Sequence, residues 1–101
     1  MNTDTNGYLV DYREWTTNIA ETLAAQESLI LTPFHYQLIF LARDFYSRYQ
    51  RTPSIRVLVN LLKETHPPEQ ASSLYIQHLF PKGAAKQLSK VAGLPKPIHC
   101  T

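Results

Sequence analysis

The chain has 101 residues, of which 44% are hydrophobic, 18% are charged and one is a cysteine, and its formal net charge is +2. This length allows one domain over residues 1–101 but not two cores of comparable size. A single cysteine excludes an internal disulfide and a thiolate-rich metal site. We expect no transmembrane helix, because no run of about 18 apolar residues occurs. The polar N-terminus has no secretory signal pattern, which predicts a cytoplasmic protein.

The first residues predict a small β element. Asn6-Gly7 is a common turn dipeptide, and Tyr8-Leu9-Val10 follows it with strand-forming side chains. Few residues precede this turn, so the strand either pairs with a later segment or lacks its partner. We therefore predict a small N-terminal β-hairpin element ahead of a helical region.

Five later segments have hydrophobic residues at helical spacing. The first starts near Trp15, with Thr16 or Thr17 as its N-cap. The second starts after Thr32-Pro33 and is the strongest helical signal in the chain, with Arg43 mostly on its polar side. Its apolar stripe consists of Phe34, Leu38, Leu41, Ala42, Phe45 and Tyr49. We expect this segment to be the central core helix.

Three shorter helices complete the predicted bundle. The third follows Thr52-Pro53, and the fourth is capped by Ser72 or Ser73. The last covers about residues 83–92 and ends at Gly93, a natural residue for a helix C-terminus. The sequence thus predicts a mainly α protein, a compact bundle of about five helices with a flexible C-terminal arm.

The arm is residues 93–101, which differ in character from the helical part. Pro95 and Pro97 exclude a helix and favour an extended path, and Gly93 precedes them as a hinge. Such an arm, mobile from Gly93, would carry Cys100 as far as about 20–25 Å. Unpaired cysteines are usually buried, but Cys100 has little core to enter. We therefore predict a carrier thiol that enters the pocket of another protein, the alternative being a surface thiol without a role.

Four lysines are candidate docking charges near this arm. Lys82, Lys86 and Lys90 follow one another at intervals of four residues, which places them on one face of the last helix, and Lys96 lies in the arm itself. They would bind an anionic surface of a partner protein. The alternative is an ordinary solvated helix face.

The histidines carry little information. His35 and His78 are expected at surface or boundary positions of helices, and His66 in a loop. His99 next to Cys100 would point to the opposite side of an extended segment, which disfavours a Cys–His pair. No cluster of His, Asp and Glu has the spacing of metal ligands, so we predict no metal and no cofactor.

A DNA-binding function is an alternative. The helix around residues 34–50, the turn at Arg51-Thr52-Pro53 and the helix from Ser54 are compatible with a helix-turn-helix, with Arg48 and Arg56 nearby. The second of these helices is rich in Val and Leu and offers few side chains that could contact bases. A purely structural subunit, with an incidental thiol, is a further alternative.

Several motifs strongly resemble those of the TusE/DsrC family of sulfur-carrier proteins. Chains of this family end in Gly-Leu-Pro-Lys-Pro-x-x-Cys-x, with the cysteine next to last. Residues 79–86 read LFPKGAAK and residues 91–101 read VAGLPKPIHCT. Earlier matches are DTNGYL, RDFY and TPSIR, at residues 4–9, 43–46 and 52–56.

The resemblance implies that Cys100 is the cysteine that forms a persulfide. Family members that resemble the partner of dissimilatory sulfite reductase have a second cysteine at the position of Ser89. Without that thiol the arm cannot close an intramolecular disulfide. The resemblance therefore implies the TusE-like role, in which the chain is a sulfurtransferase-type persulfide carrier that acts with partner proteins.

The resemblance also implies the partners. A TusBCD-like complex would load the sulfur, and an MnmA-like tRNA thiouridylase with its tRNA would receive it for 2-thiolation of the wobble uridine. The alternative within the family is a DsrC-like partner of a sulfite reductase or of a sulfur-oxidation system. Direct binding of nucleic acid by this chain stays open.

Overall fold

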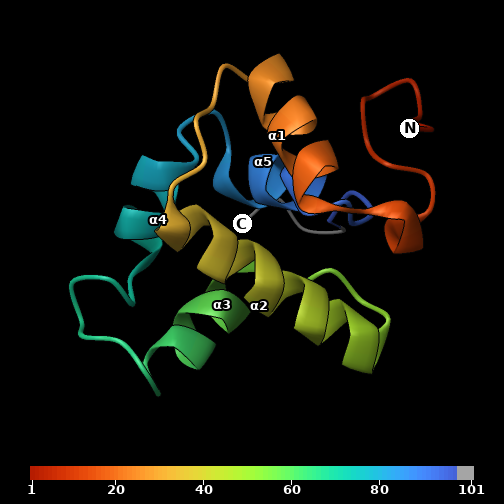
Figure 1. Ribbon diagram of the computed structural model, residues 1–101. Coiled ribbons are helices and arrows are strands. Elements are labelled where there is room, and N and C mark those ends of the chain that lie inside the picture. Colours follow the sequence, from red (N-terminus) through yellow and green to blue (C-terminus); the bar gives the residue numbers. More distant parts are fainter. Residues whose placement is uncertain (98–101) are drawn as a thin grey trace.

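The computed structural model describes residues 1–97, and these residues form a mainly helical bundle (Figure 1). A short 3-10 helix and five α-helices follow one another: η1 (Tyr12–Glu14), α1 (Thr17–Gln26), α2 (Pro33–Tyr49), α3 (Ile55–Leu62), α4 (Ser73–Leu79) and α5 (Ala84–Val91). The predicted bundle of about five helices is confirmed. No helix in the part described is long and apolar enough to cross a membrane.

The predicted β element is a single antiparallel bridge between Thr3 and Leu9, and residues 1–97 contain no named strand. The Tyr8 carbonyl accepts a 2.8 Å bond from the Asp4 N–H, and Gly7 turns the chain at a φ of 86°. The partner of the predicted strand therefore comes from the few residues before the turn.

Three of the helices start at a hydroxyl side chain. Thr16, Ser54 and Ser72 each accept a hydrogen bond from the backbone N–H three residues further on, which satisfies one of the free donors of the first helical turn. Helix α3 therefore begins after Ser54 rather than directly after Thr52-Pro53. Trp15 lies outside α1, because the extended N-cap Thr16 separates it from the helix.

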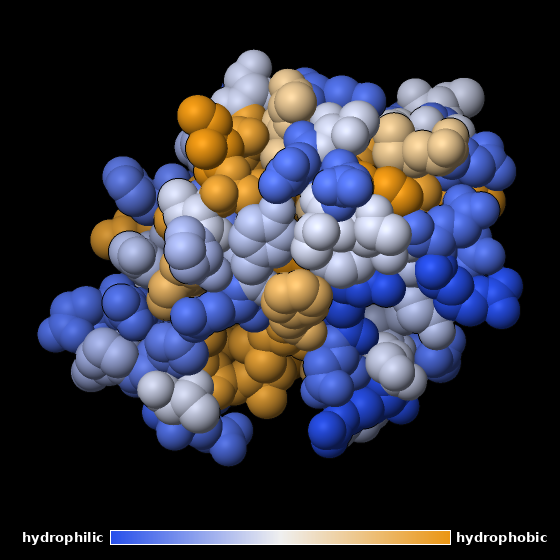
Figure 2. Space-filling model, in the orientation of Figure 1, coloured by the Kyte–Doolittle hydropathy of each residue, from blue (hydrophilic) through white to orange (hydrophobic). Residues whose placement is uncertain are grey.

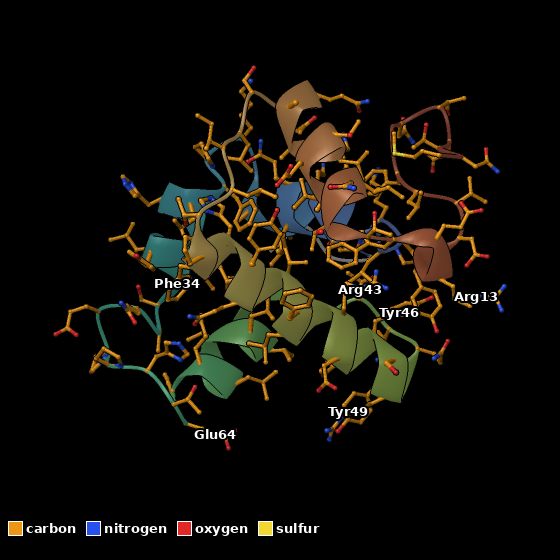
Figure 3. The ribbon with its side chains drawn as sticks, in the orientation of Figure 1. Arg13, Phe34, Arg43, Tyr46, Tyr49 and Glu64 are labelled. Carbon is orange, nitrogen blue, oxygen red and sulfur yellow. The ribbon has the colours of Figure 1, made fainter. Side chains whose placement is uncertain are left out.

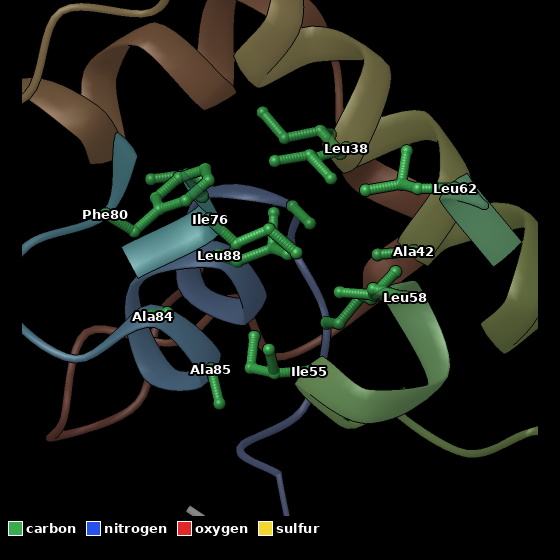
Figure 4. Packing of buried hydrophobic residues seen from close by; sticks show 14 of the residues in the cluster. Leu38, Ala42, Ile55, Leu58, Leu62, Ile76, Phe80, Ala84, Ala85 and Leu88 are labelled. Atoms are coloured by element: carbon green, nitrogen blue, oxygen red, sulfur yellow. The ribbon is translucent and has the colours of Figure 1, made fainter. Parts of the chain in front are cut away.

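The core lies where the helices meet (Figure 4). Helix α5 packs against α1, α2 and α4, and α3 packs against α2 and α4. The largest buried side chains come from all five helices and the segments that follow α4 and α5: Leu23, Leu38, Ile39, Leu58, Leu62, Ile76, Phe80, Leu88, Val91 and Leu94. Figure 2 shows hydrophobic residues at the surface in separate groups between hydrophilic ones.

The buried face of α2 differs in part from the predicted stripe. Leu38 and Ala42 are buried as expected, whereas Tyr49 is 63% exposed because it lies in the last turn, beyond the core. His35, expected near the surface, is buried. Its Nε2–H donates to the Leu79 carbonyl at 2.9 Å, and its Nδ1 accepts from the Thr32 N–H at 3.0 Å. Both ring nitrogens are satisfied, so the burial of this polar ring is not penalised.

Candidate functional site at the base of the C-terminal arm

Helix α5 ends in a geometry that turns the chain sharply into the arm. Gly93 has a φ of 71°, its N–H donates to the Lys90 carbonyl at 3.1 Å, and the Leu94 N–H donates to the Ser89 carbonyl at 3.0 Å. These two bonds form a Schellman motif, which satisfies carbonyls that the helix end leaves free. Leu94 is completely buried. The first two residues of the arm therefore belong to the packed body of the protein.

Trp15 covers this turn. Its indole Nε1–H donates to the Val91 carbonyl at 2.8 Å. A Cβ atom built on Gly93 would lie 2.6 Å from Trp15 Cδ1, a distance that real Cβ atoms do not adopt. Position 93 therefore requires glycine for two independent reasons, its positive φ and its contact with the indole ring.

Arg43, labelled in Figure 3, joins α2 to the same turn. Its guanidinium donates to the Ala92 carbonyl at 2.8 Å and to the Tyr12 carbonyl at 2.9 Å. The guanidinium carbon lies 4.5 Å from the centroid of the Trp15 ring, a cation–π distance. Burial lowers the pKa of Arg43, and the interaction with Tyr12 opposes this shift. The guanidinium group thus binds the backbone at the base of the arm instead of extending into solvent.

Thr52 holds the arm further along. Its hydroxyl donates to the Pro95 carbonyl at 2.9 Å, and Pro97, two residues on, is buried. A groove of about 520 Å³ lies beside this contact. It is lined by residues of the segment from α2 to α3, among them Tyr46 and Val57, and by the arm residues from Pro95 to Pro97. The arm therefore follows the α2–α3 segment as far as the structure describes it.

The predicted carrier residue, Cys100, and its neighbour His99 lie outside the described residues. Of the predicted arm residues, Gly93 and Pro97 are buried, and Pro95 is exposed. Movement about Gly93 stays a prediction, but the residue itself is packed beneath Trp15. In the part of the chain that the structure describes, no group of His, Cys, Asp and Glu is placed to hold a metal ion.

The four predicted docking lysines are not equivalent. Lys82 precedes α5 instead of lying within it, and Lys82, Lys86 and Lys96 are exposed. Lys90 is different, because its Nζ lies 3.3 Å from the Glu27 carboxylate and 5.3 Å from the centroid of the Tyr8 ring. The predicted stripe on one helix face is therefore wrong for Lys82, and Lys90 is already engaged within the protein.

Ser89 faces the interior of the bundle. It is 3% exposed, and its hydroxyl donates to the Ala85 carbonyl at 2.7 Å, four residues back along α5. A serine hydroxyl has no redox chemistry, and this one is already satisfied by its own helix. Position 89 therefore offers no second reactive group beside the arm.

Sequence reasoning missed Arg43, Trp15 and Thr52 as residues that hold the arm. Arg43 and Thr52 belong to the RDFY and TPSIR motifs, two of those that carry the family resemblance. Those matches were the available signal, since a polar side chain within a shared motif often has a fixed partner. The partners of Arg43 and Thr52, however, are backbone carbonyls more than 30 residues away along the chain. Nothing in the motifs themselves indicates which carbonyls these are.

Comparison with known proteins covers the whole chain. The family model described as "DsrC like protein" matches residues 1–101. The protein named "Sulfurtransferase TusE homolog" from Haemophilus influenzae is 44% identical over 100 residues, which is 99% of this chain and 92% of the relative. "Sulfurtransferase TusE" from Escherichia coli is 41% identical over the same shares.

A solved structure also has this fold. The oxidized gamma-subunit of the dissimilatory sulfite reductase (DsrC) from Archaeoglobus fulgidus is 36% identical and superposes with a TM-score of 0.88, covering 100% of this chain and 92% of that one. Sequence and architecture therefore agree over nearly the full length.

Proposed function

Because the chain belongs to the DsrC-like protein family, we propose that it is a sulfur carrier that holds sulfane sulfur on Cys100 as a persulfide. The observation that carries this proposal is the similarity to proteins named sulfurtransferase TusE or TusE homolog, which are 41–44% identical over 99% of this chain. The terminal Gly-Leu-Pro-Lys-Pro-x-x-Cys-x motif is intact in this chain. The held base of the arm supports the same role, since a carrier thiol needs a defined point of attachment.

The chemistry of such a carrier is two successive displacements at sulfur. The Cys100 thiolate attacks the outer sulfur of a donor persulfide, the donor S–S bond breaks, and the donor leaves as a thiolate. Cys100 then holds the transferred sulfur as Cys100–S–SH. An acceptor thiolate attacks that outer sulfur in turn and releases the Cys100 thiolate. Neither step needs an oxidant or a reductant, because the sulfur moves without net electron transfer.

Ser89 supports a relay in preference to disulfide chemistry. A carrier that cycles through an intramolecular disulfide needs a second thiol, and this chain has one cysteine in all. The side chain at position 89 is a buried serine that bonds to its own helix. The TusE-like role therefore fits the chain better than a role that depends on two thiols.

The finer assignment follows the TusE names of the relatives. A TusBCD-like complex donates the sulfur, and an MnmA-like tRNA thiouridylase accepts it for 2-thiolation of the wobble uridine. The DsrC name of the Archaeoglobus fulgidus structure favours a second candidate, in which the chain serves a sulfite reductase or a sulfur-oxidation system. The two candidates differ in the acceptor, so transfer assays with each acceptor separate them.

Intact-protein mass spectrometry tests the carrier role. The wild-type chain and Cys100→Ser are incubated with a persulfide donor system, and the mass is measured before and after a thiol reductant. We expect a gain of one sulfur atom in the wild type only, removed by the reductant. If the wild-type chain stayed unmodified in the presence of a TusBCD-like donor complex that is shown to be active, the carrier role would be contradicted. Specific DNA binding that survives Cys100→Ala would then favour the helix-turn-helix alternative.

A further inference from the structure

We propose that Thr52 is a positioning residue for sulfur transfer, which holds residues 95–97, the part of the arm that leads to Cys100, on the α2–α3 segment. This inference rests on the proposed carrier function and treats Gly93 as a held residue rather than a hinge. It is carried by the contacts at the two ends of residues 93–97.

The first end is held by the body of the protein. The Schellman motif fixes Gly93 and Leu94 to the end of α5. The two carbonyls just before them are taken by the Trp15 indole and the Arg43 guanidinium. A rotation at Gly93 would break these bonds and expose the buried Leu94 side chain. The start of the arm is therefore a poor hinge.

The second end depends on Thr52. Pro95 and Pro97 have no N–H, so the carbonyls and the single N–H of Lys96 are the groups through which this part of the backbone can bond. Within residues 1–97, the bond from the Thr52 hydroxyl to the Pro95 carbonyl is the one hydrogen bond between residues 95–97 and the rest of the protein. The groove beside this contact shows that packing alone does not fill the space under the arm. Thr52 is therefore the polar contact that holds residues 95–97, in addition to the packing of the buried Pro97.

A backbone held as far as Pro97 limits how far the thiol can reach. Cys100 is three residues beyond Pro97, and an extended chain of that length spans at most about 11 Å, against about 20–25 Å from Gly93 to Cys100. A tethered group searches a volume that grows steeply with the length of its tether, so a short tether raises its effective concentration at the acceptor. The acceptor sulfur must then come within that distance of Pro97.

The test uses the full chain with Thr52→Val, which keeps the shape of the side chain but removes the donor, and Thr52→Ser, which restores the donor. Thr22→Val is the matched control, because the Thr22 hydroxyl bonds only within α1. The first measurement is the ¹⁵N heteronuclear NOE of Lys96, whose amide lies between the two prolines. We expect Lys96 to be as rigid as α5 in the wild type, Thr52→Ser and Thr22→Val, and mobile in Thr52→Val.

The second measurement is sulfur transfer from persulfidated protein to an acceptor. We expect kcat/KM to fall about three- to tenfold in Thr52→Val, the range that one hydrogen bond supports, and to recover in Thr52→Ser. Alkylation of Cys100 by iodoacetamide should be unchanged, because a small reagent needs no positioned arm. An unchanged Lys96 NOE in Thr52→Val, or transfer as fast as the wild type, overturns the positioning role. A wild-type chain that accepts no sulfur at all overturns the proposed function itself, whatever the NOE of Lys96.

Discussion

Trp15 and Gly93 fit together so closely that a single added carbon would collide: a Cβ atom at position 93 would lie 2.6 Å from Trp15 Cδ1. The indole ring also holds the last turn of α5 through the Val91 carbonyl. The residue that begins the arm is therefore fixed by a side chain from the opposite end of the sequence.

Gly93→Ala is expected to lower the free energy of unfolding by about 2–4 kcal/mol, the sum of a left-handed backbone strain and an overpacked contact. Urea denaturation measures this loss. Gly7→Ala is the matched control, because Gly7 has a similar positive φ, of 86°, but its Cβ position meets only the end of the Lys90 side chain, at an ordinary contact distance of 3.6 Å. Equal losses for the two variants would mean that the contact with Trp15 contributes nothing.

Arg43 is expected to be the charged side chain of α2 whose removal costs most. Arg43→Met removes the donor of the Ala92 carbonyl and one of the two donors of the Tyr12 carbonyl, and we expect a loss of about 2–4 kcal/mol. Arg43→Lys should recover part of it, because an ammonium group cannot match the fork of a guanidinium. Arg48→Met is the control, with a change within about 0.5 kcal/mol, since its ion pair with Asp44 is exposed. Thermal and urea unfolding give both values, and similar losses for Arg43 and Arg48 would contradict this role.

The helices could be predicted because their signals are local. Thr16 and Ser72 begin helices as proposed, and the spacing of Leu58 and Leu62 identified the buried face of α3. The hydrogen bond of an N-cap joins residues only three apart, so both partners can be read from the sequence at the start of the helix.

The long-range polar contacts, those at the base of the arm among them, could not be predicted in this way. His35, Arg43 and Thr52 are polar, and an amphipathic pattern assigns polar residues to solvent. Each of them instead bonds to a backbone carbonyl at least 40 residues away, those of Leu79, Ala92 and Pro95. Every residue has a backbone carbonyl, so the sequence does not show that these three carbonyls are the ones that accept the bonds.

His35 is expected to contribute to stability although it takes no part in the proposed chemistry. His35→Leu removes the donor of the Leu79 carbonyl and the acceptor of the Thr32 N–H, and we expect a loss of about 2–4 kcal/mol in urea denaturation. His78→Leu, at an exposed position of α4, should change stability by less than about 0.5 kcal/mol. If His35→Leu were as stable as the wild type, the two hydrogen bonds would have no net value.

Lys90 and Glu27 are expected to stabilise the fold through their ion pair, a role that the exposed docking candidates do not have. Their side chains are only 18% and 21% exposed, so Lys90→Met should cost about 1 kcal/mol, whereas Lys86→Met should cost almost nothing. A double-mutant cycle with Glu27→Gln measures the pair, and we expect a coupling energy of about 0.5–1.5 kcal/mol that falls in high salt.

Binding to the sulfur donor, measured on the same variants, should respond to charge reversal at Lys82 or Lys86. A loss of donor binding in Lys90→Met without any loss of stability would show instead that Lys90 leaves Glu27 to meet the partner.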